Sequence, residues 1–363
     1  MDEQKDLFIY GTGLTAKHVY ELVKEDYKKI IFLNRNLEQY NCVSEYAECW
    51  TYTDKRITDE LKRNSKVIVA IMNTLGDIRG VMNNLKEEGF CYIIPYAKLA
   101  DIYPDKFEFL YLESVDKFKV RYEKIEEARK ILEFTDADAR SKEVFEAMIR
   151  FRETKDYNDL PQIDRKRDQY FPREISGYRT NNICYIDCGA YIGDTFSALI
   201  DYSKDVKSKI SYYVGIEPDI ENYKKLEMLI KNTKEFPFDL YQCAVCETKK
   251  NLYFDMQGTT ASKVDREVKI VNQMMVKGIS IDELNFQIIP THIKMDIEGE
   301  EKNALLGAEK LIKTYKPKLA ICIYHKPEDI YEIMELINSW ELGYRFEMRV
   351  YEDVGVDLVL YAI

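Results

Sequence analysis

The chain has 363 residues, of which 46% are hydrophobic and 32% charged, and its formal net charge is -11. This length favours two domains, and this composition is typical of a globular protein rather than a disordered or fibrous one. Because nucleic-acid binders usually neutralise phosphates with clustered Lys and Arg, the acidic balance argues against a nucleic-acid partner.

The N-terminal residues are acidic and enter a strand-like run at once, without the basic and then apolar pattern of a secretion signal. The longest wholly apolar runs, such as "VIVAIM" at 67–72, are much shorter than the roughly 20 residues of a membrane helix. We therefore expect a cytoplasmic protein with no membrane partner. The eight cysteines are scattered, and Cys243 and Cys246 form a lone C-x-x-C, so no structural metal site is expected.

Residues 1–100 alternate between strand and helix patterns. Strand-like runs at 6–13, 28–34, 65–73 and 90–96 are separated by helix-like stretches, which predicts a parallel sheet in a small Rossmann-like α/β domain. Gly11, Gly13 and Ala16 form a G-x-G-x-x-A turn, but the second strand ends at Asn34 rather than at an acid. We expect a scaffold role or homo-oligomer assembly for this domain, with a nucleotide or nucleotide-sugar ligand as the alternative.

Residues 101–164 are charged and have helical periodicity without strand signals, which predicts a helical connector. From residue 165 to 363 the alternation resumes. Strands are predicted at 182–189, 211–218, 238–245, 291–299 and 318–325, and two final strands are joined by a short Gly-containing loop. This pattern predicts a mostly parallel sheet with a C-terminal antiparallel hairpin.

Ionisable residues gather at the predicted strand ends of the C-terminal half. Ligands of open parallel sheets bind beyond the carboxyl ends of the strands, where loops and helix N-termini converge. The candidates, in chain order, are Asp187 with Gly189 and Gly193, Glu217 before Pro218, Cys243 with Ala244, Asp296 with Glu298, and His325.

These residue types suit a nucleoside ligand with a cationic centre. Glycines let the backbone approach a ligand closely, and Glu217 can accept both hydroxyl hydrogens of a ribose. Asp187 and Asp194 flank the glycine turn and would repel a pyrophosphate, whereas the sulfonium and amino groups of S-adenosylmethionine would tolerate them.

Other interpretations of these residues stay open. Asp194 can instead cap a helix, and Glu300 and Glu301 are interpreted as complements of a helix dipole. His325 is either functional or a core histidine, and His18 and His292 are interpreted as structural.

With these residues in view, the C-terminal half resembles the FkbM family of S-adenosylmethionine-dependent methyltransferases. The resemblance rests on "QYF" at 169–171, "YIDCGAYIGDT", "VGIEPDIENYKKLE", "SIDELN", "HIKMDIEGEEKNALLGAEKLI" and "KPKLAICIYHKPED", in this order. It covers roughly residues 165–363 and implies a class I methyltransferase fold with a seven-stranded sheet.

The resemblance also implies roles for particular residues. Asp187, Gly189, Ala190, Gly193 and Asp194 would hold the methionine part of S-adenosyl-L-methionine. Glu217 would bind the ribose hydroxyls, Cys243 and Ala244 would border the adenine, and Asp296 would lie beside the sulfonium and the substrate. Tyr170 and Pro218 would be further cofactor-binding residues. The class I pattern often has glycine at the position of Tyr191, which the FkbM pattern does not require.

We expect transfer of a methyl group to a hydroxyl of a sugar or related small-molecule or glycan acceptor. His325 is the leading general base, because imidazole accepts protons near neutral pH, and Lys294 and Glu298 are alternatives that could orient the hydroxyl. The polar loop 257–264 suits a sugar-like acceptor. A metal-assisted version with Asp296, Glu298 and His325 as ligands remains open, as do a non-catalytic scaffold and an NAD-dependent oxidoreductase.

Overall fold

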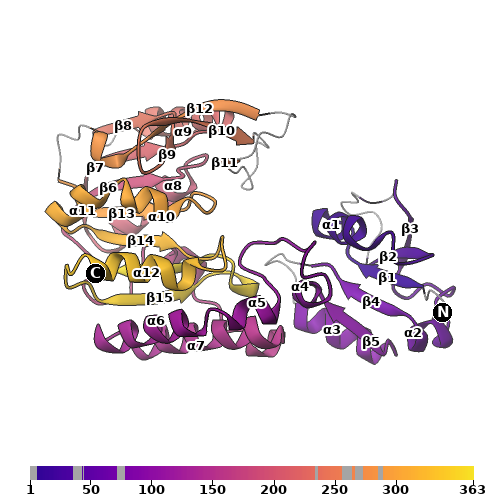
Figure 1. The fold of residues 1–363 in the computed structure, drawn as a ribbon. Helices are drawn as coiled ribbons and strands as arrows, with labels where there is room; N and C mark the ends of the chain where they lie inside the picture. The colour runs from indigo at the N-terminus through magenta and orange to yellow at the C-terminus, as the bar shows by residue number, and fades with distance from the viewer. Residues whose placement is uncertain are drawn as a thin grey trace. The chain divides into compact units, whose positions relative to one another are not determined.

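The computed structural model describes residues 6–35, 43, 45–71, 78–233, 236–255, 264–265, 273–284 and 289–363. The chain forms two compact units (Figure 1). Unit 1 comprises Met1–Val120 and Ala147–Leu160, and unit 2 comprises Arg121–Glu146 and Pro161–Ile363. The segment predicted as a connector at 101–164 is helical, but it is divided between the two units rather than set apart.

Unit 1 contains a five-stranded parallel sheet with the strand order β3-β2-β1-β4-β5, as the strand and helix alternation predicts. The apolar side chains of Leu7, Phe8 and Ile9 on β1 are all fully buried, which is typical of a strand covered on both faces. Its elements are β1 (Leu7–Tyr10), α1 (Leu14–Val23), β2 (Ile30–Asn34), β3 (Glu48–Thr51), α2 (Asp59–Asn64), β4 (Lys66–Val69), α3 (Ile78–Glu87), β5 (Tyr92–Pro95), η1 (Tyr96–Lys98), α4 (Leu99–Ile102), α5 (Val115–Lys119) and η2 (Tyr157–Asp159).

The turn at Gly11 and Gly13 of unit 1 packs against the residue after β4 and the last residue of β2. Gly11 has φ +123°, and a Cβ there would lie 2.8 Å from the carbonyl oxygen of Ala70. Asn34, at the end of β2, donates from Nδ2 to Thr12 Oγ1 at 2.6 Å. The side chain in the place of the usual ribose-binding acid is thus directed to the turn itself.

Unit 2 contains a seven-stranded mixed sheet with the order β15-β16-β14-β13-β6-β7-β8. The five neighbouring strands β14, β13, β6, β7 and β8 pair in parallel. Strand β16 pairs antiparallel with both β14 and β15, so the predicted C-terminal hairpin is present. Its strands are β6 (Asn182–Cys188), β7 (Lys209–Ile216), β8 (Phe238–Tyr241), β13 (His292–Met295), β14 (Lys318–Cys322), β15 (Phe346–Val350) and β16 (Leu358–Ala362).

Helices accompany this sheet, and Figure 1 shows α10, α11 and α12 together in front of it. On α12, five apolar side chains, including Ile330, Ile333 and Ile337, are at most 3% exposed and form the face that packs inward. The helices of unit 2 are α6 (Tyr122–Phe134), the first half of α7 (Ala139–Thr154), η3 (Lys166–Asp168), α8 (Asp194–Asp205), α9 (Ile220–Thr233), η4 (Ile281–Glu283), α10 (Glu301–Leu306), α11 (Glu309–Tyr315), α12 (Asp329–Ser339) and η5 (Asp353–Gly355).

A second, four-stranded sheet of unit 2 has the order β11-β10-β12-β9. The single strand predicted at 238–245 is in fact two strands, because β8 joins the large sheet and β9 (Ala244–Val245) pairs with β12 (Gln273–Ile279) in the small one. The other two strands are β10 (Lys250–Asp255) and β11 (Val264–Asp265). Cys243 therefore lies at the point where the chain changes sheets.

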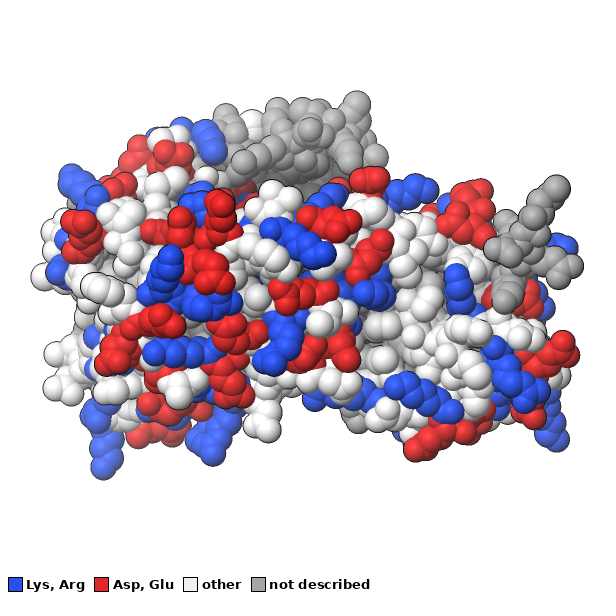
Figure 2. All heavy atoms as spheres, turned by 60° about the horizontal axis from the view of Figure 1, so that its bottom comes forward, with Lys and Arg blue, Asp and Glu red and all other residues white. Residues whose placement is uncertain are grey.

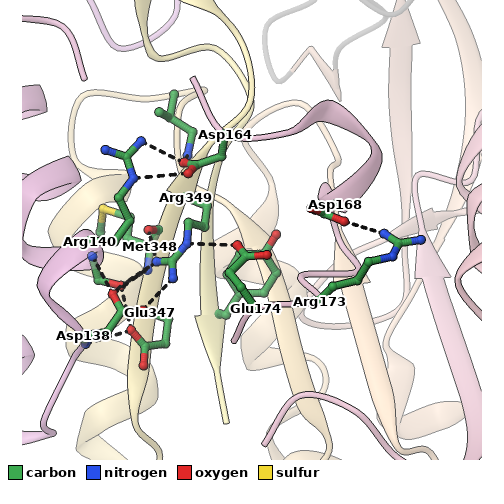
Figure 3. Close-up of polar contacts among 12 residues, drawn as sticks. Asp138, Arg140, Asp164, Asp168, Arg173, Glu174, Glu347, Met348 and Arg349 are labelled. Atoms are coloured by element: carbon green, nitrogen blue, oxygen red, sulfur yellow. Dashed lines mark hydrogen bonds and ion pairs between the residues drawn. The ribbon is translucent and has the colours of Figure 1, made fainter. Parts of the chain in front are cut away.

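A polar network around Arg349 on β15 anchors the start of α7 within unit 2 (Figure 3). Arg349 donates from Nη2 to Asp138 Oδ2 at 2.6 Å and from Nη1 to Ser141 Oγ at 2.9 Å. Glu347 Oε2 accepts from the backbone N–H of Asp138 and from the hydroxyl of Ser141. Because the side chains of Arg349 and Glu347 are each only 3% exposed, these are buried charges whose stability depends on their partners.

The face shown in Figure 2 carries acidic and basic side chains interspersed with one another. On α6, Lys124 pairs with Glu127 at 2.9 Å, and both side chains are more than half exposed. Such pairs contribute little to stability. In the part of the chain that the structure describes, none of the helices has the length and apolar character needed to cross a bilayer.

Candidate functional site

A cavity of about 370 Å³ opens at the carboxyl ends of β6, β7 and β13 in unit 2. Most of the residues predicted for the site line it: Tyr170, Gly189, Asp194, Glu217, Pro218, Cys243, Ala244, Lys294, Asp296 and Glu298. Four predicted residues, Asp187, Ala190, Gly193 and His325, are buried next to lining residues but are not part of the lining.

The two glycines of the first turn are required by packing within the protein. Gly189 has φ +78°, and a Cβ there would lie 2.0 Å from the carbonyl oxygen of Asp296. Gly193 has φ +95°, and its Cβ would lie 2.5 Å from Leu229 Cδ2 on α9. Both glycines let the turn pack closely, Gly189 against the residue after β13 and Gly193 against α9, and Gly189 also borders the cavity. Their predicted contact with a ligand stays a prediction.

Tyr191, between the two glycines, also has a left-handed backbone, with φ +47°. Glycine adopts this conformation without steric cost, which gives a physical reason for glycine at this position in related patterns. The backbone N–H of Tyr191 donates to Glu217 Oε2 at 2.9 Å, so the turn is held by the acid at the end of the neighbouring strand.

Asp194 is the first residue of α8, and the N-cap position is occupied by Gly193 without a side-chain cap bond. The capping interpretation of Asp194 is therefore wrong. Its side chain is exposed and borders the cavity, where it adds a negative charge beside the helix N-terminus.

Glu217 follows β7 directly and is only 5% exposed. Each carboxylate oxygen accepts one backbone N–H, Oε2 from Tyr191 and Oε1 from Asp219, both at 2.9 Å. Burial raises the pKa of Glu217 to about 7, although these two N–H donors act in the opposite direction. An oxygen of an ionised carboxylate can accept more than one hydrogen bond, so the fixed carboxylate still has capacity for a ligand diol.

Asp187 and Lys294 form a buried pair beneath the cavity. Lys294 Nζ lies 3.2 Å from Asp187 Oδ1 and donates to the carbonyl oxygen of Gly189 at 2.7 Å. Tyr213 donates its hydroxyl hydrogen to Asp187 Oδ2. Burial opposes the charge of Lys294, but the Asp187 and Asp296 carboxylates outweigh it and raise its pKa. Lys294 therefore remains a cation that supports the turn, which argues against a role as proton acceptor.

Asp296 follows β13 directly, and its carboxylate is held by two phenols. Tyr170 donates to Oδ2 at 2.8 Å and Tyr324 donates to Oδ1 at 3.4 Å. Burial tends to raise the pKa of Asp296, but the positive charges of Lys294 and His325 lower it by more. The pKa of Asp296 therefore lies below its ordinary value. Asp296 is thus an ionised carboxylate at the wall of the cavity.

His325 lies three residues beyond the end of β14, and its side chain is only 2% exposed. Nδ1 lies 3.0 Å from Glu301 Oε1, and Nε2 lies 3.5 Å from Asp296 Oδ1 and 3.8 Å from Glu298 Oε2. Burial lowers its pKa, but these carboxylates, led by Glu301, raise it to about 10. A protonated imidazole has no lone pair for a proton, so this environment disfavours the predicted base role.

Glu301 is a residue that the sequence interpretation missed. It is fully buried, and Oε1 accepts the backbone N–H of Ile297 at 2.7 Å in addition to its contact with His325. It was interpreted as a dipole complement, because a Glu in the first turn of a helix is usually exposed. The sequence signal that could have identified it is its position five residues after the strand-end acid Asp296.

Lys166, Glu352 and Asp357 also line the cavity and come from segments that carried no site prediction. Lys166 Nζ contacts Glu352 Oε1 at 2.7 Å and also pairs with Asp357. No local pattern links the segment before β6 to the β15–β16 loop, so only the fold brings these three together. The loop predicted as an acceptor contact at 257–264 lies outside the described residues, apart from the strand residue Val264.

His18 and His292 have structural positions, as expected. His18 Nδ1 lies 2.7 Å from the hydroxyl of Tyr96 in unit 1. His292 Nε2 lies 3.1 Å from the carbonyl oxygen of Tyr178, and burial lowers its pKa to about 4.

Comparisons with known proteins find a matching family model and a solved structure of similar fold. Residues 187–346 match the family model described as methyltransferase FkbM domain. The fold is similar to the crystal structure of methyltransferase FkbM from Methylobacillus flagellatus KT, with a TM-score of 0.79 and 20% sequence identity over 99% of this chain and 90% of that one. A search of curated proteins found no match.

Proposed function

Because residues 187–346 form a domain of the FkbM methyltransferase family, we propose that this chain is an S-adenosylmethionine-dependent O-methyltransferase acting on a hydroxyl of a sugar or related small-molecule or glycan acceptor. The observation that carries the cofactor assignment is Glu217, a buried acid fixed by two backbone N–H groups at the edge of the cavity. A carboxylate at the end of the second strand of such a sheet is the usual acceptor for ribose hydroxyls. The mostly parallel sheet with its antiparallel hairpin supports a class I methyltransferase fold.

The charge of the cavity favours a cationic ligand over a pyrophosphate. Carboxylates line it from several elements, while its lining lysines, Lys166 and Lys294, are both paired with acids. A ligand with two phosphates would meet like charges at Asp194 and Asp296. S-adenosylmethionine would supply a methyl group on a cationic sulfur, and the bond from carbon to sulfur breaks as the acceptor oxygen bonds to that carbon.

Residues of the cavity fit the remaining parts of such a ligand. The wall formed by Ile216, Ala244 and Val245 is apolar and suits a flat base. Asp194 and the carbonyl groups of the Gly189 turn can accept hydrogen bonds from an amino group. Asp296, fixed by Tyr170 and Tyr324, lines the same cavity and can orient the acceptor there.

The acceptor hydroxyl must lose a proton, and the carboxylates of Asp296 and Glu298 are better placed to receive it than His325. Both line the cavity with side chains that are 24% exposed, whereas the imidazole is buried and held in its charged form. Even a weak base contributes when it is positioned at the reacting hydroxyl. We thus assign the proton transfer to this carboxylate pair in place of His325.

The proposal is tested by incubating the intact chain with methyl-labelled S-adenosylmethionine and fractionated glycans and small polyols. We expect label in a hydroxyl-bearing fraction, in a product that resists mild alkali as a methyl ether does, and no transfer by Asp296→Ala. Binding of S-adenosylhomocysteine without label in any fraction would instead favour the non-catalytic scaffold.

A further inference from the structure

Asn222, in the first turn of α9, is a polar residue in an otherwise apolar stripe. The buried residues of this helix are Asn222, Leu226 and Ile230, which lie one above the other on the face that packs inward. Asn222 is only 2% exposed. An apolar side chain would fill this position without the cost of burying a polar group, so the carboxamide needs a polar partner.

The backbone of Asn222 has a partner, but its side-chain oxygen has none. The backbone N–H donates to Asp219 Oδ1 at 3.1 Å, so the capping of α9 is the role of Asp219 and not of Asn222. Oδ1 of Asn222 is buried and has no hydrogen-bond partner within the described residues. Because a buried acceptor without a donor is costly, we expect this oxygen to meet a donor from outside the protein.

A ligand can supply this donor, since Asn222 lines the cavity of unit 2. Strands β7 and β8 are parallel neighbours, so the turn that leads into α9 and the segment after β8 lie at the same edge of the sheet. Asn222 therefore shares this part of the cavity with Glu217 from the turn and with Ala244 and Val245 from the segment.

These surroundings favour the edge of a flat base over a sugar hydroxyl as the partner of Asn222. Ile216, Ala244 and Val245 form an apolar wall, which suits the face of a ring. Glu217 already offers two carboxylate oxygens to hydroxyl hydrogens. A carboxamide has an acceptor and a donor in one plane, and this pair matches the amino group and a ring nitrogen of adenine, as Asn does in DNA recognition.

We propose that Asn222 is a specificity-determining residue that recognises the edge of adenine. Oδ1 accepts a hydrogen bond from the 6-amino group, and Nδ2 donates to a ring nitrogen. The inference rests on the proposed function for the identity of the nucleoside, which is the one in S-adenosylmethionine. A nucleoside without the amino group would bury Oδ1 without a donor, so the cavity should reject it.

The test compares adenosine with purine riboside, which has a hydrogen in place of the 6-amino group, in ligand-observed NMR titrations of the intact chain. We expect the wild type to bind adenosine about tenfold more tightly or better. In Asn222→Leu, which keeps a similar shape, the affinity for adenosine should fall about tenfold. The affinity for purine riboside should not fall, because the unpaired oxygen is gone.

Two controls separate recognition of the base from other roles. Glu217→Gln should weaken the binding of adenosine and purine riboside by the same factor, since both carry the same ribose. Asn232→Leu makes the same change at an exposed position near the other end of α9 and should leave both affinities unchanged. Asn222→Ala is the second variant, and it decides the question if Asn222→Leu does not fold.

S-adenosylhomocysteine is titrated in parallel and tests the proposed function separately. Equal affinity of the wild type for adenosine and purine riboside, or an equal loss of both in the Asn222 variants, overturns the inference even if S-adenosylhomocysteine binds. A preference for adenosine that depends on Asn222, without binding of S-adenosylhomocysteine, would uphold the inference and contradict the proposed function. Absence of adenosine binding up to about 5 mM overturns the inference.

Discussion

At the scale of single residues, the protonation state of Glu217 decides what its carboxylate can accept. The pKa of Glu217 is raised to about 7 by burial, so its two oxygens are fully available as acceptors only above that pH. Below it, one oxygen carries a proton and donates instead. Since ribose hydroxyls need acceptors, the ionised form is the one that binds.

The first prediction is therefore a pH dependence of ligand affinity. Between pH 8 and pH 6, the affinity for S-adenosylhomocysteine should fall, by up to about tenfold per pH unit below 7. Calorimetric titrations at several pH values measure it. Glu217→Gln should bind more weakly at pH 8 and show a much flatter profile, and an unchanged slope in this variant would mean that another group titrates.

The second prediction concerns Gly189, whose packing the structure explains. Gly189→Ala should destabilise the protein by clearly more than the roughly 1–2 kcal/mol of a left-handed alanine, because its Cβ would overlap the Asp296 carbonyl. Gly343→Ala is the matched control: Gly343 has φ +73°, yet no atom lies within 4 Å of its Cβ position. Urea unfolding measures the free energy of unfolding of both variants. An equal loss in Gly189→Ala and Gly343→Ala would contradict the role of the contact between the new Cβ and the Asp296 carbonyl.

The sequence predicts those site residues whose position follows from a local pattern, such as the end of an apolar strand. Asp187, Glu217 and Asp296 were found because each stands in or directly after an apolar strand, and the parallel sheet aligns these ends. The partnership of Glu301 with His325 and that of Lys166 with Asp357 were missed, because each joins segments that only tertiary packing brings together. The left-handed turn at Tyr191 was likewise not evident from its residue type.

At the scale of elements, α7 depends on β15 through the buried network in Figure 3. Arg349 contacts Asp138, Ser141 and Glu174, and its own side chain is 3% exposed. Removing one member of such a network leaves its partners without compensation. Surface pairs on the neighbouring α6 lack this dependence.

The third prediction is that Arg349→Met lowers the free energy of unfolding by about 3–5 kcal/mol, the usual cost of breaking a buried charge network. Lys124→Met on α6 removes an exposed pair and should change it by less than about 1 kcal/mol. Chemical denaturation followed by circular dichroism compares the two. A loss below 1 kcal/mol for Arg349→Met would show that α7 is held by apolar packing alone.

The element boundaries show a similar limit of the sequence. The apolar run at 238–245 has a continuous strand pattern, yet β8 and β9 belong to different sheets, since the pairing partner of each is chosen by distant strands. His325 was expected to end a strand, but β14 ends at Cys322 and the histidine lies in the turn beyond. Periodicity identified the strands, whereas their ends and partners were set by the whole sheet.

At the scale of the whole molecule, both units contain parallel strands, and among the residues that the structure describes, the strand-end acids that border the cavity belong to unit 2. In unit 1, Asn34 is engaged with Thr12 at the place of a ribose-binding acid. We therefore propose that the nucleoside ligand binds in unit 2, and the scaffold or assembly role of unit 1 stays a prediction.

The fourth prediction follows for hydrogen exchange in the presence of excess S-adenosylhomocysteine. Protection should rise at 187–196, 216–222, 243–246 and 294–300, which border the cavity. A hundredfold excess over the dissociation constant should stabilise the folded unit by about 2.7 kcal/mol. New protection confined to residues 10–18 and 33–35 would move the ligand to the glycine turn of unit 1.

A calorimetric titration of the intact chain with S-adenosylhomocysteine at pH 8 tests most directly whether unit 2 binds the cofactor through Glu217. We expect one site per chain, an affinity at least tenfold lower in Glu217→Gln, and an unchanged affinity in Asn34→Asp, which places an acid at the corresponding strand end of unit 1. No binding heat together with no shift in melting temperature, or equal binding by wild type and Glu217→Gln, would contradict it.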